Sequence, residues 1–291
     1  MTEPLENGAE LLAAAEDVAR RGGEVLMDFW PRMDSIQTEV KGHPIELVTE
    51  ADRAAEEVVV KGLLDRFPEH GVLAEEGVLT PTGRASRDDG DYLWIVDPLD
   101  GTTNYVHRLP FFAVAVALAV RGEVVLGVVH APAMDMTFTA VRGCGANCNG
   151  EPISVTDTGE LSAALVGTGF SYNRSDDGVD DNIERLARAL HVARDVRRLG
   201  SAELDLCMTA SGRFDAYWEL YLKPYDVAAG AIVVQEAGGM VSDLVGGGDW
   251  LYGGQVLATN GWLHQAMLDV VGGAPPTPLV DGQTPSSDTM S

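Results

Sequence analysis

Basic side chains are scarce in this chain of 291 residues. Lysine occurs only at Lys41, Lys61 and Lys223, and 45 acidic residues outnumber 20 basic ones to give a net charge of −25. Such a surface repels polyanions, so we expect neither nucleic acid nor an anionic membrane as a partner. The acidic surplus fits two origins. One is adaptation to high salt, and the other is arginine-favouring codon usage combined with an ordinary acidic surface.

Long hydrophobic segments and cysteines are also few. The longest apolar run covers residues 111–120, well short of the roughly 20 residues that cross a bilayer. The chain starts Met-Thr-Glu-Pro-Leu-Glu, which is acidic where a signal peptide is basic. Three cysteines fit a reducing compartment, and no further Cys or His pair completes a zinc site with Cys144 and Cys148. We therefore expect a cytoplasmic location.

Hydrophobic periodicity predicts the order of elements, and a hydrophobic content of 45% suffices for a full core. Residues 9–29 carry apolar side chains at helical spacing, and residues 41–49 indicate a loop. The capping box Thr-Glu-Ala-Asp at 49–52 opens a helix that ends before Pro68. Strands are expected at 72–74, 93–96, 113–120, 124–131, 137–141, 163–167, 195–199, 215–219 and 256–259, and further helices at 181–193, 201–211, 227–237 and 262–271.

The alternation of strands and helices after residue 163 indicates helices packed on the faces of a sheet. We expect one folded unit over residues 9–271, preceded by a short tail over residues 1–8. Residues 272–291 are rich in Pro, Ser, Thr and Gly. Because such a composition cannot bury much apolar surface, we predict a disordered C-terminal tail.

The most informative motif is Trp-Ile-Val-Asp-Pro-Leu-Asp-Gly-Thr-Thr-Asn at residues 94–104. An apolar strand runs into Asp97 and Asp100, and a glycine followed by two threonines can open a helix. Carboxylates at a strand end hold Mg²⁺ through oxygen, and the N–H groups of a helix start can take a phosphate beside it. Pro98 leaves the Leu99 carbonyl free to turn toward an ion. An ordinary Asp-Pro turn would explain the same residues, so the motif needs support from elsewhere.

That support comes from acidic residues at matching points. Glu75 follows an apolar strand, Asp52 lies just inside a helix start, and Asp226 precedes an apolar helix. Phosphate monoesters hydrolyse slowly because an anionic ester repels a nucleophile and the leaving alkoxide is poor. Divalent ions held by carboxylates on several strand ends remove both obstacles. The set therefore points to metal-assisted phosphate chemistry.

With these acidic positions, the two signatures at residues 94–107 and 225–239 resemble the inositol monophosphatase family of Mg²⁺-dependent, lithium-sensitive phosphatases. The resemblance spans about residues 9–271. It implies an α+β or α/β fold, a layered αβαβα sandwich. In it, residues 9–152 carry the metal loops and residues 153–271 form an α/β substrate half. It also implies two to three Mg²⁺ ions and a homodimer.

The resemblance further assigns the metal ligands. The first ion corresponds to Glu75, Asp97 and the carbonyl of Leu99. The second corresponds to Asp97, Asp100 and Asp226, so that Asp97 bridges the two, and a weak third ion lies near Glu75. Such ions neutralise phosphoryl oxygens, lower the pKa of a bound water and stabilise the departing oxygen.

By the same resemblance, Thr102 and Asp52 are the hydroxyl and carboxylate that orient the attacking water, next to Glu75. The N–H groups of Gly101 and Thr102 would bind the phosphate beside Asp100. A simpler interpretation exists for Asp52, because an acid at the third helical position caps a helix in any protein.

Substrate choice is expected on the far side of the phosphate. Gly200, Ser201 and Ala202 open a helix whose free N–H groups can bond hydroxyls, and Glu219 can accept from a polyol. In the family these positions and Asp226 contact the inositol ring. The spacing of Glu219 before Asp226 fits the inositol branch, although Glu219 could also be a solvated carboxylate at a strand end.

Lys41 and Glu46 match a mobile loop that covers the metals in the family. Here the sequence departs from the family pattern, because Glu46 stands where that loop usually has aspartate. Ala74 also replaces a usual glycine, and Tyr225 replaces a usual tryptophan. None of these changes removes a ligand, but they leave ion affinity and lithium sensitivity open.

The favoured function is Mg²⁺-dependent hydrolysis of inositol 1-phosphate or another small phosphorylated polyol or sugar. Related sequences act on fructose 1,6-bisphosphate, histidinol phosphate or phosphoadenosine nucleotides, and these activities stay as alternatives. A binding protein that lost turnover would need a damaged ligand, and every acidic ligand is present. Arg197 and Arg198 either pair with acidic neighbours or line the cleft.

Overall fold

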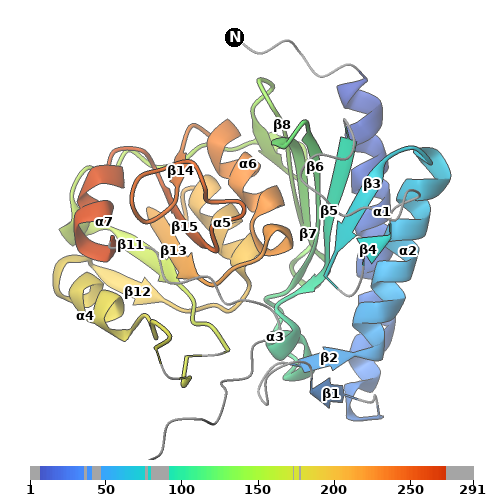
Figure 1. Ribbon diagram of the computed structural model, residues 1–291, viewed down its shortest axis with the longest axis horizontal. Helices are drawn as coiled ribbons and strands as arrows, with labels where there is room; N and C mark the ends of the chain where they lie inside the picture. Colours follow the sequence, from blue (N-terminus) through green and yellow to red (C-terminus); the bar gives the residue numbers. More distant parts are fainter. Residues whose placement is uncertain are drawn as a thin grey trace, which may run out of the picture.

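The computed structural model describes residues 7–35, 38–40, 47–75, 78–79, 92–172, 174–176 and 178–272. In these ranges, helices and two sheets alternate in five layers (Figure 1). The layers are an outer helix pair, an eight-stranded sheet, a middle helix pair, a five-stranded sheet and a second outer helix pair. The predicted αβαβα sandwich is therefore confirmed. The predictions for residues 1–6, Lys41, Glu46 and 273–291 lie outside the described residues.

Three helical layers alternate with the two sheets (Figure 1). The first outer layer holds α1 (Gly8–Phe29) and α2 (Glu50–Arg66), the middle layer α5 (Ala202–Ala210) and α6 (Ala228–Glu236), and the second outer layer α4 (Ile183–Val192) and α7 (His264–Val271). The short helices are η1 (Trp30–Ser35), α3 (Thr102–Val106), η2 (Pro132–Met134), η3 (Leu161–Ala163) and η4 (Pro224–Asp226).

The strands form a large sheet, a small sheet and a two-stranded ribbon. The large sheet has the order β10-β9-β8-β7-β6-β5-β3-β4 and the small sheet β12-β11-β13-β15-β14. The strands of the large sheet are β3 (Gly71–Ala74), β4 (Val78–Leu79), β5 (Tyr92–Asp100), β6 (Ala113–Val120), β7 (Glu123–Ala131), β8 (Met136–Val141), β9 (Ala146–Cys148) and β10 (Glu151–Pro152). Those of the small sheet are β11 (Leu165–Thr168), β12 (Asp195–Arg197), β13 (Ala216–Leu220), β14 (Met240–Ser242) and β15 (Gln255–Thr259).

Strand β6 shows why the longest apolar run is a strand. Its alanines belong to the core shared with α5 and α6, whereas Val114, Val116 and Leu118 belong to the core shared with α1 and α2. A strand covered on both faces has no position for a polar residue. The hairpin predicted between β6 and β7 is confirmed, with Arg121 and Gly122 both at positive φ.

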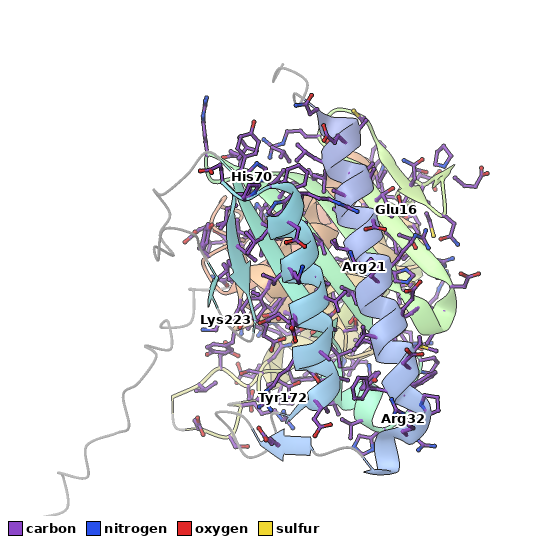
Figure 2. All side chains as sticks on the ribbon, turned by 90° about the vertical axis from the view of Figure 1, so that its right-hand side faces the viewer. Glu16, Arg21, Arg32, His70, Tyr172 and Lys223 are labelled. Carbon is purple, nitrogen blue, oxygen red and sulfur yellow. The ribbon has the colours of Figure 1, made fainter. Side chains whose placement is uncertain are left out.

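Helices α1 and α2 pack closely on the large sheet. Gly62 of α2 makes room for α1, because a Cβ atom there would lie 2.7 Å from Cγ1 of Val18. Charged side chains, among them Glu16 and Arg21, lie on the side of the helix pair turned away from the sheet (Figure 2). The helix pair is thus amphipathic, as the apolar spacing of residues 9–29 predicts.

The start of α2 confirms the predicted capping box. The hydroxyl of Thr49 accepts an N–H of the first turn at 3.1 Å, and the carboxylate of Asp52 accepts the Thr49 N–H at 2.9 Å. The predicted loop is wrong over its last three residues, because β2 (Leu47–Thr49) pairs antiparallel with β1 (Thr38–Val40). Strands of three residues show too little alternation to be recognised in a sequence.

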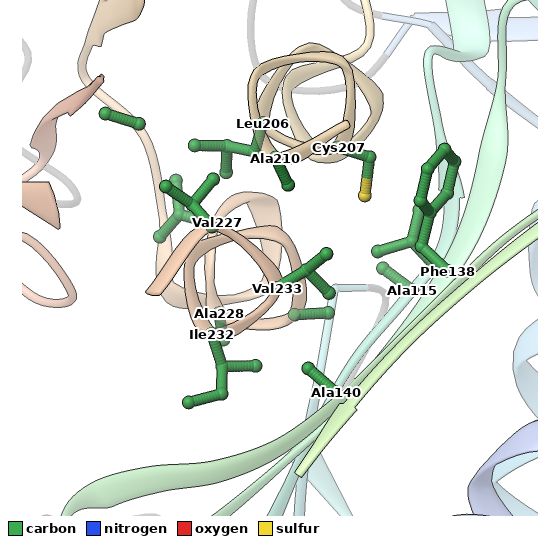
Figure 3. Packing of buried hydrophobic residues seen from close by; sticks show 14 of the residues in the cluster. Ala115, Phe138, Ala140, Leu206, Cys207, Ala210, Val227, Ala228, Ile232 and Val233 are labelled. Carbon is green, nitrogen blue, oxygen red and sulfur yellow. The ribbon is translucent and has the colours of Figure 1, made fainter. Parts of the chain in front are cut away.

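The middle helix pair fills the space between the two sheets. Leu206 and Cys207 of α5, Ile232 and Val233 of α6 and Phe138 of β8 belong to one buried cluster (Figure 3). Both helices are apolar over most of their surface, because each contacts a helix and a sheet face. This layer brings the first turns of α5 and α6 toward the end of β5.

The other predicted helices and strands of the described residues are found within a few residues of their expected bounds. The sequence does not predict strands β1, β4, β9, β10 and β14, which have two or three residues each. In the part of the chain described here, no helix has both the length and the apolar character to span a bilayer. We propose that the folded unit consists of two halves that meet between residues 152 and 153.

The contact between β7 and α6 gives a stability prediction. A Cβ atom on Gly127 would lie 2.6 Å from the carbonyl oxygen of Ala229, a backbone atom that cannot move away easily. Gly127→Ala should therefore lower the free energy of unfolding by about 1–3 kcal/mol. The control is Gly159→Ala, where nothing lies within 4 Å of the added carbon. Equal urea midpoints for the two variants would contradict this packing.

His130 of β7 gives a prediction about pH. Burial lowers its pKa to about 4, and its Nδ1 lies 2.9 Å from Oγ1 of Thr137. The unfolded chain takes up this proton below about pH 6.5, so the stabilisation is complete above that pH and is lost toward pH 4. His130→Gln should therefore flatten the fall of unfolding free energy between about pH 7 and pH 5. Exposed His191→Gln is the control, and parallel profiles for wild type and His130→Gln would refute the assignment.

Candidate active site

Asp97 and Asp100 lie at the carboxyl end of β5, where the pairing with β6 becomes irregular. The register shifts between these two residues. Residues three apart on a regular strand face opposite sides of the sheet, so the irregularity lets both carboxylates approach one site. Asp97 accepts the N–H of Leu99 at 2.9 Å, and the two carboxylates are 2% and 7% exposed.

Two further carboxylates join them from neighbouring elements. Glu75 follows β3, the strand parallel to β5, and its N–H donates to the carbonyl of Val96 at 3.3 Å. Asp226 is the last residue of η4, two residues before α6 begins, and its carboxylate accepts the N–H of Lys223 at 2.6 Å. Separate segments of the chain thus deliver acidic side chains to the end of β5.

The electrostatics of this cluster are unfavourable without a cation. Burial raises the pKa of Asp97 well above its ordinary value, and the charges of Glu75, Asp100 and Asp226 raise it further. Burial, then the charge of Glu75, raises the pKa of Asp226 in the same way. Like charges taken out of water repel strongly unless a positive ion compensates them.

An all-oxygen donor set suits Mg²⁺, and the mutual repulsion of these groups fits a site built for a cation. Among the described residues, however, no three His, Cys, Asp or Glu side chains already enclose an ion-sized space. Cation binding would therefore have to draw the carboxylates together. The carbonyl oxygen of Leu99, proposed as a ligand, accepts the hydroxyl of Thr102 at 3.1 Å.

Asp100 has a second role that the sequence did not reveal, because it caps α5. Its carboxylate accepts the Ser201 hydroxyl at 2.5 Å and the N–H groups of Ala202 and Glu203 at 3.0 and 2.8 Å. Burial raises the pKa of Asp100 to about 6, against these hydrogen bonds, which lower it. A cation would share this carboxylate with the start of α5.

Asp52 contacts Thr102 and caps α2 at the same time. One oxygen accepts the Thr49 N–H at 2.9 Å and the Thr49 hydroxyl at 2.5 Å, while the other lies 3.3 Å from Oγ1 of Thr102. The two interpretations of Asp52 offered by the sequence are therefore compatible. Asp52 is 1% exposed and Thr102 is 9% exposed, so the pair is shielded from bulk solvent.

Gly101 joins this region to the candidate substrate segment. Its φ is 93°, and a Cβ atom there would lie 3.0 Å from the carbonyl of Phe111 and 3.3 Å from that of Gly200. Asn104, which the sequence analysis did not single out, donates to the carbonyls of Phe111 and Leu199 at 2.7 and 2.8 Å. Its place at the end of the motif at residues 94–104 is the only sequence signal for this role.

The start of α5 differs from the expected set of free N–H groups. The N–H of Ala202 and the hydroxyl of Ser201 both donate to Asp100, so neither is free to meet a ligand hydroxyl. Gly200 has a φ of 90°, and the position of its missing Cβ lies 2.4 Å from Nη1 of Arg198. The segment from Gly200 to Ala202 is therefore bound by Asp100 and closely approached by Arg198.

Glu219 of β13 lies in a confined position. The hydroxyl of Tyr217 donates to its carboxylate, and a Cβ atom on Gly169 would lie 1.9 Å from the same carboxylate. Burial raises the pKa of Glu219 to about 7, while the hydrogen bond from Tyr217 and the charge of Arg198 lower it. Glu219 is thus half-buried and hydrogen-bonded rather than a solvated strand-end residue.

The two arginines left open by the sequence have different surroundings. Arg197 pairs with Asp195 at 2.6 Å on the surface. The positive charge of Arg198 lowers the pKa of Glu219 and of Asp205. Of these two residues, Glu219 was expected at the substrate side. Among the described residues, Oδ1 of buried Asp205 has no hydrogen-bond partner. Asp205 gave no signal in the sequence because it lies beyond the stretch Gly200, Ser201 and Ala202 on which the substrate side was predicted.

The comparisons with known proteins agree with these features. The model of the inositol monophosphatase family matches residues 7–271. A Nus factor SuhB of Pseudomonas aeruginosa is 39% identical over 262 residues, covering 90% of this chain and 95% of its own length. An inositol-1-monophosphatase of Synechocystis sp. is 38% identical over 262 residues, covering 90% of this chain and 88% of its own.

Solved structures give the same result. The inositol monophosphatase from Anabaena (Nostoc) superposes with a TM-score of 0.80 at 38% identity, covering 93% of this chain and 98% of that one. The extragenic suppressor protein suhB from Bartonella henselae gives 0.82 at 32% identity, with coverages of 91% and 99%. The chain belongs to the inositol monophosphatase family.

Proposed function

We propose that this protein is a Mg²⁺-dependent phosphatase that hydrolyses inositol 1-phosphate to myo-inositol and phosphate. The convergence of four carboxylates at the end of β5, next to the buried Thr102–Asp52 pair, carries the proposal. Family membership supports hydrolysis of a phosphate ester. It does not select the substrate, because the relatives carry different names.

The residues that would hold the ions are those at the end of β5 and beside it. Glu75, Asp97 and the carbonyl of Leu99 would hold one ion. Asp97, Asp100 and Asp226 would hold another, and a weaker third would bind near Glu75. Bound Mg²⁺ supplies charge neutralisation of the phosphoryl group and a more acidic water. The Gly101 and Thr102 N–H groups, at the start of α3, would bind phosphoryl oxygens.

The proton of the attacking water needs an acceptor. Oγ1 of Thr102 lies 3.3 Å from Asp52, so it can accept from a water and pass a proton to that carboxylate. Thr49 holds Asp52 in place with two hydrogen bonds to one oxygen, which fixes the direction of the other oxygen, the one that faces Thr102. Glu75 would help to orient the same water.

Recognition of the alcohol would fall to Glu219 of β13. A carboxylate with one oxygen held by Tyr217 can accept a hydroxyl with the other. A polyol offers such hydroxyls, which supports an inositol or sugar phosphate. Asp226 and the segment Gly200, Ser201 and Ala202 would border the same ring, with the Ser201 hydroxyl and the Ala202 N–H holding Asp100 rather than the ligand. Asp100 would lie between ring and phosphate.

The family resemblance also implies a cellular location, an oligomeric state, an inhibitor and a covering loop, and we propose these as well. The protein would work as a cytoplasmic homodimer. Lithium would inhibit it by replacing Mg²⁺ at the second site. The covering loop would contain Lys41 and Glu46. The strong negative charge disfavours nucleic acid as a partner.

Asp97→Asn tests the metal assignment. The change should reduce Mg²⁺-dependent phosphate release to about one hundredth or less, because one ligand would serve two ions. The fold should survive, and metal-free Asp97→Asn should melt at a higher temperature than metal-free wild type, because the amide removes a repelled buried charge. Exposed Glu184→Gln serves as the control. Wild-type turnover in Asp97→Asn would end the assignment.

Glu219→Ala tests substrate recognition. Loss of a charge-assisted hydrogen bond worth about 1.5–3 kcal/mol should lower kcat/KM for inositol 1-phosphate roughly 10- to 150-fold. A small aromatic phosphate ester, which lacks the hydroxyl, should lose less than about threefold. Tyr217→Phe should show a smaller loss in the same direction, because it leaves the carboxylate but releases one oxygen.

Equal losses on both esters would instead place Glu219 in support of the metals or the fold. The same phosphate-release assay with fructose 1,6-bisphosphate, histidinol phosphate and phosphoadenosine phosphate ranks the alternatives. A clear preference for one of these would replace inositol 1-phosphate as the substrate.

A further inference from the structure

Glu203, the second residue of α5, connects the two middle helices through a buried carboxylate. It is 0% exposed. One carboxylate oxygen accepts the N–H of Ala229 at 3.1 Å, and the other accepts the N–H of Gly230. These two donors lie in the first turn of α6. Glu203 therefore caps a helix that begins 25 residues further along the chain.

Both oxygens of the Glu203 side chain act as acceptors. An ionised carboxylate accepts two N–H groups more strongly than a protonated carboxyl, whose hydroxyl oxygen is the weaker acceptor, and these hydrogen bonds oppose burial, which raises the pKa of Glu203. The positive end of the α6 dipole favours a negative charge here. Gly230 makes the contact possible, because a Cβ atom at that position would lie 2.6 Å from the Glu203 carboxylate and from Cβ of Leu206.

In these surroundings, fold stability alone does not explain a negative charge on Glu203. The carboxylates of Asp100 and Asp226 act on Glu203 as like charges. Well-packed apolar residues are often as stabilising as buried charged groups, or more so. A buried negative group beside two candidate cation ligands is favourable mainly when a cation is bound near them.

Glu203 also completes a continuous connection between those two ligands. Its own N–H donates to Asp100 at 2.8 Å, and its carboxylate holds the first turn of α6. Asp226 lies two residues before the first residue of α6. A displacement of α6 relative to α5 would therefore change the separation of Asp100 and Asp226 directly.

We propose that Glu203 is a positioning residue that fixes α6 on α5 and so sets the spacing of Asp100 and Asp226 for the second cation. The proposal rests on the proposed function, because it needs these two residues to be cation ligands. Glu203 itself does not touch the cation or the ester. It acts through the N–H groups of Ala229 and Gly230.

Two variants separate position from charge. Glu203→Gln keeps the side-chain length but removes the charge and one acceptor. Glu203→Asp keeps the charge but is one methylene too short to reach both N–H groups. The control is Asp215→Asn, because buried Asp215 also accepts two donors, the Thr156 hydroxyl at 2.6 Å and the Leu165 N–H at 2.7 Å. Asp215 lies just before the start of β13, whereas the candidate substrate residue Glu219 lies near the end of that strand.

The measurement is Mg²⁺ binding to the full chain, by isothermal titration and by the rise of melting temperature with Mg²⁺, without substrate. We expect both Glu203 variants to bind Mg²⁺ at least about 10-fold more weakly than wild type. Asp215→Asn should lose melting temperature and keep wild-type affinity. Should Glu203→Gln fail to fold, Glu203→Asp carries the test alone.

The possible results are distinct. Wild-type affinity in Glu203→Asp with weak binding in Glu203→Gln would leave only a charge effect and overturn the positioning role. Equal weakening in Asp215→Asn would show a general loss of stability and overturn it as well. Absence of Mg²⁺ binding in the wild type would overturn the proposed function and this inference together, whereas wild-type affinity in all variants would overturn this inference alone.

Discussion

Repulsion among buried carboxylates is the constraint on which the centre of this molecule depends. Burial is the main cause that raises the pKa of Asp97, Asp100 and Asp226, and neighbouring acidic charges raise the pKa of Asp97 and Asp226 further. A fold can keep such a cluster only if fixed dipoles and a cation compensate it. The structure provides the dipoles through backbone N–H groups, which the carboxylates of Asp100 and Glu203 accept.

The layered architecture follows from this need. Two helices between two sheets can aim their first turns at the end of a strand in the large sheet, and each first turn receives a buried carboxylate. The apolar remainder of α5 and α6 then packs on both sheets (Figure 3). The second half thus contributes to the site mainly through helix starts, whereas the first half contributes strand ends.

Much of this organisation could be predicted from the sequence because its signals are local. The unbroken apolar run of β6, the capping box at Thr49 and the adjacent Asp97 and Asp100 each need only a few residues to be recognised. The capping role of Asp100 could not, because its partners lie about a hundred residues away in the chain. Glu203 resembles an ordinary helical surface residue until its contact with α6 is known.

The most direct test of the central claim is the position of a divalent cation. Anomalous diffraction from crystals soaked in Mn²⁺, an oxygen-ligated substitute for Mg²⁺, locates the ion without reference to activity. We predict a peak at the end of β5 within about 2.0–2.6 Å of carboxylate oxygens of Asp97 and of Glu75 or Asp226. Ordered, uncoordinated carboxylates with Mn²⁺ bound only elsewhere on the acidic surface would contradict it.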